Sequence, residues 1–303
     1  MNTGETSVQV ASATGGRPTD EELDLFGLTH RGKVRSENQD HFLLGTIHPQ
    51  VVVHGTSLPE PDTLPLRGGR FGTVLLVADG VGGGSDGGAA ARLAGEVVTR
   101  YVASTLRCYH LAGAKGDEAF FEALREAALQ AHDAVRAEAA SRTGNAQMAT
   151  TLTLGIGVWP WLYVVQVGDS RCYLYAQGRL RQITRDQTVA QALLDQGILR
   201  PDDAQRSPLS SVLASAIGSA EATPVVTRVD VAERGCVVLF CSDGLTRHVT
   251  DDELAQHLAS MTSAEQVCRA LLDLALARGG TDNITIIAGR APLNVRTSGA
   301  GAR

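Results

Sequence analysis

The sequence predicts an α+β fold in which antiparallel sheets pack face to face and helices cover their outer faces. Short apolar runs joined by tight turns follow one another over residues 149–184, a pattern typical of an antiparallel meander. Two long stretches, 93–106 and 120–135, instead carry apolar residues at helical spacing. Because these helices do not alternate one for one with the strands, a doubly wound parallel sheet is disfavoured.

Apolar runs bounded by turn residues predict the strands, and apolar residues three or four positions apart predict the helices. Thr250 and Glu253 form a capping box, which opens a helix predicted to continue to about Ala277. Trp159-Pro160-Trp161 separates two neighbouring strands. In chain order, the predicted strands are 23–30, 73–78, 152–158, 162–168, 171–175, 180–183, 225–231, 236–242 and 284–287, and a further short helix is 188–199.

The size of the chain allows one large domain. It has 303 residues, of which 43% are hydrophobic, enough to bury a single substantial core. Segments rich in small and polar residues without periodicity predict a flexible leader over 1–22 and a flexible tail over 291–303. The domain then covers 23–290, with a long loop or ribbon inserted at 46–70.

Charge and cysteine usage exclude several classes of protein. The formal net charge is −6 and no long Lys/Arg run occurs, so nucleic acid is not an expected partner. No apolar run approaches the roughly 20 residues that span a bilayer, so we expect no membrane partner. The five cysteines form no CxxC pair, and the N-terminus lacks the pattern of a secretory signal. We predict reduced thiols and a cytoplasmic location, and we expect a monomer.

Four aspartates stand at the ends of predicted strands. Asp79 ends the apolar run 74–78, Asp169 and Asp243 end two further runs, and Asp282 stands just before the run 284–287. A charge at the tip of a buried strand is costly unless a cation lies beside it. One such aspartate can be a turn residue that caps its own backbone, but four in one chain are better explained by a shared site for a divalent cation.

The candidate ligands are oxygen donors, which favours Mg²⁺ or Mn²⁺ over zinc or copper. His248 and Cys241 flank Asp243, but their spacing matches no zinc motif. The closely spaced acidic loop of an EF-hand is also absent from the sequence. Two ions about 4 Å apart can activate a water and hold a phosphoryl oxygen. Arg35 fits this chemistry, because a guanidinium grips a phosphate dianion through two hydrogen bonds.

Seven short motifs occur together in the order of a known family. The chain resembles the metal-dependent PPM-type (type 2C) protein serine/threonine phosphatases, especially bacterial members, over about residues 25–289. The motifs are Arg35-Ser36-Glu37-Asn38-Gln39-Asp40, Ala78-Asp79-Gly80-Val81-Gly82-Gly83, Ala149-Thr150-Thr151-Leu152, Val167-Gly168-Asp169-Ser170-Arg171, Thr184-Arg185-Asp186, Cys241-Ser242-Asp243-Gly244-Leu245 and Gly280-Thr281-Asp282-Asn283.

The resemblance implies a metal centre of two ions, with a third site. Asp79 is expected to bridge two ions, and the Gly80 carbonyl to ligate one of them. Asp243 and Asp282 would complete the first ion, and Asp169 with Asp243 would hold a third, weaker ion.

The resemblance also implies a reaction and a fold. Arg35 would bind the phosphate, and Asp40 would hydrogen-bond the waters on the metals. A water activated between two ions would hydrolyse phosphoserine or phosphothreonine on proteins, and a serine/threonine kinase and its substrates are the expected partners. The implied fold is a four-layer α-β-β-α sandwich, with a small flap subdomain over 187–217 beside the cleft.

Three positions depart from the family pattern. Gln39 stands where members often carry a Glu that ligates the second metal, and its neutral amide oxygen predicts a high Mn²⁺ requirement. Val81 stands where animal members place a His that is a candidate general acid. Gly84 and the Gly87-Gly88 pair replace a His and a Gly-Glu pair of bacterial relatives, which predicts a flexible loop.

Two other classes of protein are alternatives to the phosphatase interpretation. A catalytically inactive relative used as a binding module usually loses core acids, which this chain keeps at Asp79, Asp169, Asp243 and Asp282. A dinucleotide-binding enzyme is suggested by the G-x-G-x-x-G spacing of 82–87. However, Asp79 would repel a pyrophosphate, and a helix is predicted where that fold needs its second parallel strand.

Overall fold

The fold is a sandwich of two antiparallel five-stranded sheets. The computed structural model describes residues 16–50, 52–54, 56–57, 66–82, 86–110, 116–142 and 147–292. One sheet has the order β1 (Asp24–His30), β12 (Ile284–Arg290), β11 (Val237–Cys241), β8 (Arg171–Ala176) and β9 (Arg179–Gln182). The other has the order β10 (Val225–Asp230), β7 (Trp161–Val167), β6 (Leu152–Val158), β3 (Gly72–Ala78) and β2 (His41–Ile47).

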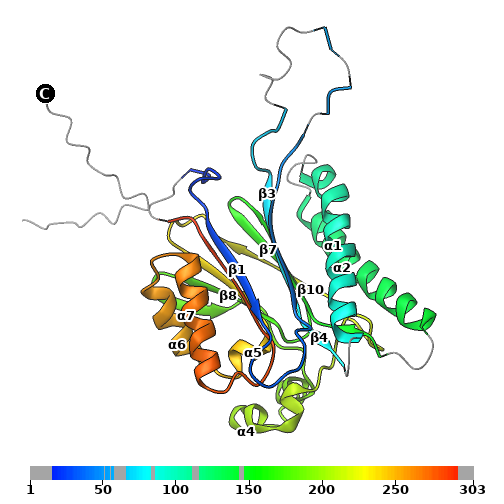
Figure 1. Cartoon of the computed structure of the whole chain (residues 1–303), viewed down its shortest axis with the longest axis vertical. Helices are drawn as coiled ribbons and strands as arrows, with labels where there is room; N and C mark the ends of the chain where they lie inside the picture. Colours follow the sequence, from blue (N-terminus) through cyan, green and yellow to red (C-terminus); the bar gives the residue numbers. More distant parts are fainter. Residues whose placement is uncertain are drawn as a thin grey trace, which may run out of the picture.

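Helices cover the outer face of each sheet (Figure 1). The helices α1 (Asp86–His110) and α2 (Gly116–Ser141) pack on the sheet that contains β3, and α6 (Asp251–Ala259) and α7 (Ala264–Ala277) pack on the sheet that contains β12. The predicted α+β fold and its four-layer α-β-β-α arrangement are therefore confirmed.

The run at the centre of β3 shows why the sequence lacks polar alternation there. Leu75 and Val77 face the other sheet, where they pack with Phe240 and Ile287. Val74 and Leu76 face the helices α1 and α2. Because successive side chains point to opposite faces, a strand that is covered on both sides must be apolar at every position. β3 pairs antiparallel with both neighbours, which excludes the parallel unit of a dinucleotide-binding fold.

The helices that follow β11 differ from the prediction. The single helix expected from Thr250 to Ala277 is wrong, because α6 ends at Ala259 and α7 begins at Ala264. Ser263 caps the new start by accepting a hydrogen bond from the Gln266 backbone N–H at 3.0 Å. Both helices present apolar faces to the same sheet, so the periodicity continues across the break. A short helix, α5 (Asp243–Thr246), follows β11 and was not expected.

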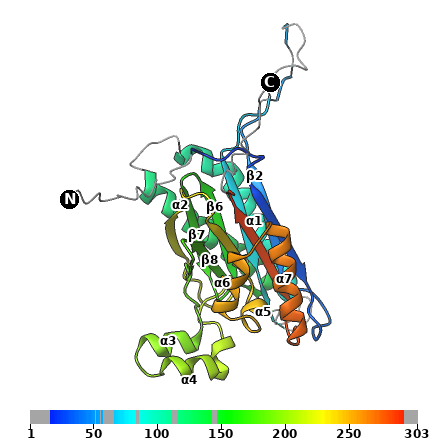
Figure 2. The ribbon, with the colours of Figure 1, turned by 90° about the vertical axis from the view of Figure 1, so that its left-hand side faces the viewer.

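The segment 187–217 forms a small helical unit at one end of the sandwich (Figure 2). It contains α3 (Val189–Asp195), α4 (Pro201–Arg206) and a 3₁₀ helix (Pro208–Ser211). The helix predicted over 188–199 is present but shorter, and it ends before Gly197, whose φ of 72° suits glycine. That this segment acts as the family's flap stays a prediction.

The insertion and the two ends are partly outside the described residues. Within 46–70, β2 continues to Ile47, and Gln50 and Arg67 form an isolated antiparallel bridge. In the described part of the leader, Arg17 Nη2 donates to the Phe71 carbonyl at 2.9 Å, so this part contacts the domain. Residues 1–15 and 293–303 lie outside the described residues.

The cysteines and the helices bear on the predictions from composition, and one small ribbon was not expected. Of the five cysteines, Cys172, Cys236, Cys241 and Cys268 are free and buried. None of the helices in the described ranges is long and apolar enough to cross a bilayer. A small ribbon of β4 (Gly80–Val81) and β5 (Ala149–Thr150) was not expected, and it extends the chain beyond β3 toward the site.

Candidate active site

The strand register brings the predicted acids to one end of the sandwich. Ala78 pairs with His41, so Asp79 follows the end of β3 where Asp40 precedes β2. Leu152 pairs with Val167, which brings Asp169 to the same end of this sheet. In the other sheet, Cys241 pairs with Ile286, so Asp243 and Asp282 lie together. Antiparallel pairing therefore gathers residues that are up to 242 positions apart (Asp40 to Asp282).

Asp79 lies at the centre of the cluster. Its backbone N–H donates to Thr151 Oγ1 at 3.0 Å, and its carbonyl accepts from the Thr151 N–H at 2.8 Å. Burial raises its pKa well above the ordinary value, and the negative charges of Asp40, Asp243, Asp169 and Asp282 raise it further. The structure thus places five carboxylates within electrostatic reach of one another.

Asp40 is held from the opposite sheet. Its Oδ2 accepts hydrogen bonds from Ser242 Oγ and Thr285 Oγ1, each at 2.7 Å. Its Oδ1 is buried without a hydrogen-bond partner. Burial raises the pKa of Asp40 to about 6, although both hydroxyls oppose the shift. An unpaired buried carboxylate oxygen is costly, so this atom favours a cation or an ordered water beside it.

Asn283 ties the loop that carries Arg35, Gln39 and Asp40 to the start of β12. Its Nδ2 donates to the carbonyls of Arg31 at 2.8 Å and Glu37 at 2.9 Å. Its Oδ1 accepts from the Gln39 backbone N–H at 2.8 Å. One amide therefore satisfies three backbone groups of a loop that forms no regular structure, and it fixes the loop beside Asp282.

Asp169 occupies a buried turn between β7 and β8. Asp169 is only 7% exposed. Burial raises its pKa to about 8, with smaller contributions from the negative charges of Asp243 and Asp186. The adjacent Arg171 makes a two-point ion pair with Asp186, at 2.8 and 2.7 Å. This pair fixes the backbone on which Asp169 is presented.

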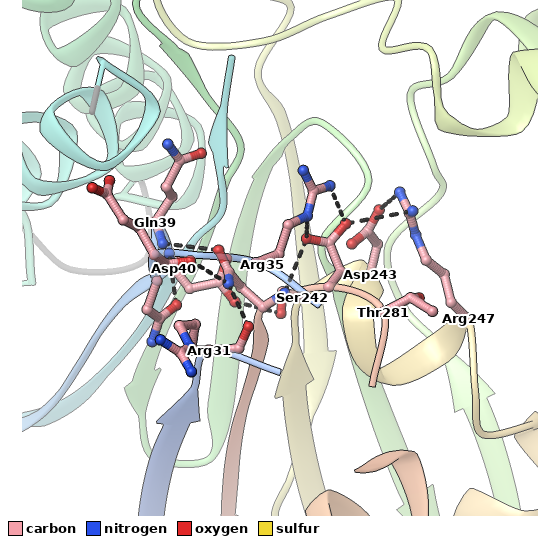
Figure 3. Close-up of polar contacts among 12 residues, drawn as sticks. Arg31, Arg35, Gln39, Asp40, Ser242, Asp243, Arg247 and Thr281 are labelled. Atoms are coloured by element: carbon pink, nitrogen blue, oxygen red, sulfur yellow. Dashed lines mark hydrogen bonds and ion pairs between the residues drawn. The ribbon is translucent and has the colours of Figure 1, made fainter. Parts of the chain in front are cut away.

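Two arginines contact the remaining acids (Figure 3). Arg35 donates from Nε and Nη2 to the two carboxylate oxygens of Asp282, at 2.7 and 2.8 Å. Arg247 Nη2 donates to Asp243 Oδ2, and its Nη1 lies 3.5 Å from Asp282 Oδ2. Burial raises the pKa of Asp243, and Arg247 opposes this rise.

Gly80, Gly87 and Gln39 form a tight contact beside the acids. A Cβ on Gly80 would collide with the Gly87 backbone, and one on Gly87 would lie 2.9 Å from Gln39 Oε1. Glycine at both positions lets the two backbones meet. The Gln39 amide therefore lies next to the glycine that contacts Gly80. Val81, which replaces the His of animal members, is 37% exposed in β4.

The donor set fits hard divalent ions. The donor groups are carboxylates, a side-chain amide and a backbone carbonyl, all oxygen ligands of the kind that hard cations prefer. Burial, and after it the charges of neighbouring acids, raises the pKa values of Asp79, Asp169 and Asp243. Within the described ranges, no three acidic, His or Cys side chains already converge as a complete set of ligands. Two of the five carboxylates instead contact guanidinium groups.

The sequence profile of the protein phosphatase 2C family matches residues 55–277. This match covers well over half of the chain, and the protein therefore belongs to the protein phosphatase 2C family. The fold and the collected acids agree with this assignment.

Individual relatives are bacterial. The chain is 34% identical to the serine/threonine protein phosphatase PstP of Mycobacterium tuberculosis over 214 residues, which are 71% of this chain and 39% of that protein. It is 29% identical to the serine/threonine phosphatase stp of Listeria welshimeri, over 86% of this chain and 92% of that protein. A solved structure of the catalytic domain of PstP in complex with two manganese ions has a TM-score of 0.68 and 27% identity, covering 89% of this chain and 99% of that one.

Sequence reasoning missed several residues of the site. Ser242 and Thr285 were given no role, although both hold Asp40. Arg247 was also missed, although it stands four residues after Asp243 on a helical turn, a spacing at which opposite charges meet. That spacing was visible in the sequence, whereas the contacts of Thr285 depend on the pairing of distant strands.

Proposed function

We propose that this protein hydrolyses phosphoserine and phosphothreonine in proteins, using Mn²⁺ or Mg²⁺. The observation that carries the proposal is the collection of five mutually repelling carboxylates at one end of the sandwich, with Arg35 beside them. Family membership supports the reaction class, and the two manganese ions of the PstP structure support the choice and number of ions.

The acids would hold the ions as follows. Asp79 would serve two ions, the Gly80 carbonyl would ligate one of them, and the Gln39 amide oxygen would serve the second. Asp243 and Asp282 would complete the first. When bound, such a pair of ions lowers the pKa of a water and neutralises charge on a phosphoryl oxygen. Asp169, with Asp243, would serve a third, weaker site.

The remaining roles belong to the protein's own side chains. Asp40 would accept hydrogen bonds from waters through Oδ1, because Ser242 and Thr285 already occupy Oδ2. Arg35 would bind the phosphate dianion through the planar pair of N–H groups that it now presents to Asp282. A water or another group would protonate the leaving oxygen, since Val81 cannot donate a proton.

The partners follow from the substrate class. A serine/threonine kinase and its phosphorylated substrates would supply the phosphoproteins, and the flap at 187–217 would lie beside the cleft that receives them. The insertion at 46–70 has no role that the described contacts reveal.

Phosphate release from a phosphothreonine peptide tests the proposal. We expect activity with Mn²⁺, its loss on addition of a chelator, and a loss of at least about 100-fold in Asp243→Asn, because the electrostatic stabilisation of a transition state is of this size. Asp273→Asn is the matched control, since Asp273 is exposed on α7, away from the site. A folded wild type that releases no phosphate under any of these conditions would indicate an inactive binding module.

A further inference from the structure

Arg247 is a charged residue of the site that the proposed function leaves without a role. It directly follows α5, and its backbone N–H donates to the Asp243 carbonyl at 2.9 Å. This helical turn brings the guanidinium back over Asp243, where Nη2 contacts Oδ2. Its Nη1 reaches to 3.5 Å from Asp282 Oδ2. A single side chain therefore contacts two carboxylates, one at the start of α5 and one in the loop before β12.

The contacts of Arg247 differ from those of Arg35. Arg35 spans both oxygens of one carboxylate, Asp282, which is the geometry that suits a phosphate. Arg247 instead bridges Asp243 and Asp282, and its side chain is 40% exposed. Figure 3 shows Arg247 on one side of Asp243 and Arg35 on the other.

The local charge balance gives this bridge a physical role. Burial lowers the pKa of Arg247, but the carboxylates of Asp243, Asp282 and Asp169 outweigh burial, so the net pKa is raised. Arg247 is thus fully charged and opposes the repulsion among these acids. A divalent ion that binds Asp243 and Asp282 must replace this favourable interaction or share the same oxygens with it.

We propose that Arg247 is a resident counter-cation of the metal site, which competes with divalent ions for Asp243 and Asp282 and so sets the ion concentration that the site requires. This inference rests on the proposed function, because it takes both aspartates to be metal ligands. It makes Arg247 a positioning residue that acts on the ligands and does not contact the substrate.

Two consequences of opposite sign follow from replacing Arg247 by a neutral residue. Divalent ions should bind more tightly, because the competitor is gone and the site is more negative. The protein in the presence of a chelator should be less stable, because the repulsion among the buried acids is no longer offset. A residue that merely supports the local structure would weaken both properties together.

Calorimetric titration of the full chain with Mn²⁺ measures the first consequence. We expect Arg247→Gln to lower the dissociation constant for Mn²⁺ about tenfold, the effect of losing one competing ion pair in a partly enclosed site. Arg247→Lys keeps the charge and should stay close to the wild type. Arg269→Gln is the matched control, because Arg269 makes the same i,i+4 type of ion pair with Glu265 on α7.

Thermal unfolding with excess chelator measures the second consequence. Arg247→Gln should lower the melting temperature by roughly 2 °C or more, whereas Arg269→Gln should change it by less. An unchanged or weaker affinity of Arg247→Gln for Mn²⁺ would overturn the inference, whatever its stability. If the Mn²⁺ affinity is unchanged and KM for a phosphopeptide rises at saturating Mn²⁺, Arg247 instead contacts the substrate.

The wild type and Asp243→Asn separate this inference from the proposed function. If the wild type binds Mn²⁺ and Asp243→Asn does not, the metal site stands and the result for Arg247 alone decides. If the folded wild type binds no Mn²⁺, the proposed function and the inference fall together.

Discussion

At the scale of single residues, the site is dominated by the cost of burying negative charge. Asp40 shows which effect is larger, because it accepts two hydrogen bonds of 2.7 Å and burial still raises its pKa to about 6. Hydrogen bonds from neutral hydroxyls do not compensate for lost hydration of a carboxylate. A cation beside the carboxylate can compensate for this loss. Two arginines contact acids of the site, and the oxygen donors also suit divalent ions.

Gln39 should limit the affinity of the second metal position. Replacing Gln39 by Glu exchanges a neutral amide oxygen for a carboxylate, which is a stronger ligand for a hard cation. We expect Gln39→Glu to lower the Mn²⁺ concentration that gives half-maximal phosphatase activity. Gln256→Glu adds the same charge on the exposed face of α6 and should leave this concentration unchanged. A result in which the two variants behave alike would exclude the predicted role.

Arg35 should act mainly on substrate binding. Arg35→Lys keeps the positive charge but loses the planar pair of donors, and one charge-assisted hydrogen bond is worth about 1.5–3 kcal/mol. We expect KM for a phosphothreonine peptide to rise about tenfold or more at saturating Mn²⁺. Steady-state kinetics measure this, and an unchanged KM would argue against phosphate binding by Arg35.

At the scale of elements, short connections around the acids set their positions. Gly244, in the first turn of α5, lies against the Asn283 carbonyl, where a Cβ would collide with backbone. The close approach of α5 and the start of β12 is what brings Asp243 beside Asp282. Arg278 stabilises the connection between α5 and α6, because its Nη1 donates to the His248 carbonyl and to Glu253 Oε2, each at 2.7 Å.

Gly244→Ala should separate these two elements. The added methyl group meets backbone atoms that cannot rotate away, so we expect a loss of more than about 2 kcal/mol of unfolding free energy and weaker Mn²⁺ binding. Gly178→Ala is the comparison, because Gly178 has a φ of 74° but open space around it, which costs about 1 kcal/mol of strain. Urea denaturation and Mn²⁺ titration compare the two, and equal effects would contradict the predicted collision.

The capping box of α6 gives a prediction for stability alone. Thr250 Oγ1 accepts from the Glu253 backbone N–H, and the Glu253 side chain accepts from the Thr250 N–H at 3.0 Å. Thr250→Ala should cost about 1 kcal/mol of unfolding free energy, and Thr250→Ser should cost less because it keeps the hydroxyl. Urea denaturation measures both. A Thr250→Ala variant as stable as the wild type would show that the cap contributes nothing.

At the scale of the whole molecule, the two sheets pack face to face, and one end of this sandwich carries the five aspartates of the candidate site. The interior of each layer is apolar, so the packing that stabilises the sandwich also forces Asp40, Asp79 and Asp169 out of water. The protonation of these buried acids therefore makes the stability of the fold depend on pH.

Stability in the presence of a chelator should fall as the pH rises. The pKa values of Asp40, about 6, and Asp169, about 8, lie above the ordinary 3.8. Between pH 4 and 8, the folded chain therefore retains protons that the unfolded chain has released, and stability decreases with pH in this window. Glu253, with a pKa lowered to about 2, acts with the opposite sign but only below about pH 4.5.

Urea denaturation across pH 5 to 8 measures this dependence. Saturating Mn²⁺ at pH 7.5 should restore the lost stability, because an ion that binds only the folded chain stabilises it. Stability that rises from pH 5 to 8 in chelator would mean that the acids are not buried together.

The layers of the fold and the acids of the candidate site could be predicted from the order of residues alone. Unbroken apolar runs predict strands that are buried on both faces, and apolar stripes at helical spacing predict helices that pack on a sheet. Four aspartates at the ends of strands predict a shared cation site. These features depend on local periodicity and composition, which are legible without a structure. The continuous stripe from Leu254 to Ala275 also concealed the break at Ser260–Ser263, because two helices on one sheet share the same apolar spacing.

The contacts between these groups could not be predicted, because they depend on how distant segments pack in the folded chain. The partners of Asp40 come from β12 and from the residue after β11, more than 200 positions away. The contacts of Arg35 and of Arg247 with Asp282 also join distant segments. Strand register and loop packing fix such contacts, and neither is encoded in the spacing of residues along one segment. The charges were therefore visible in the sequence, whereas the way in which they offset one another became visible only in the folded chain.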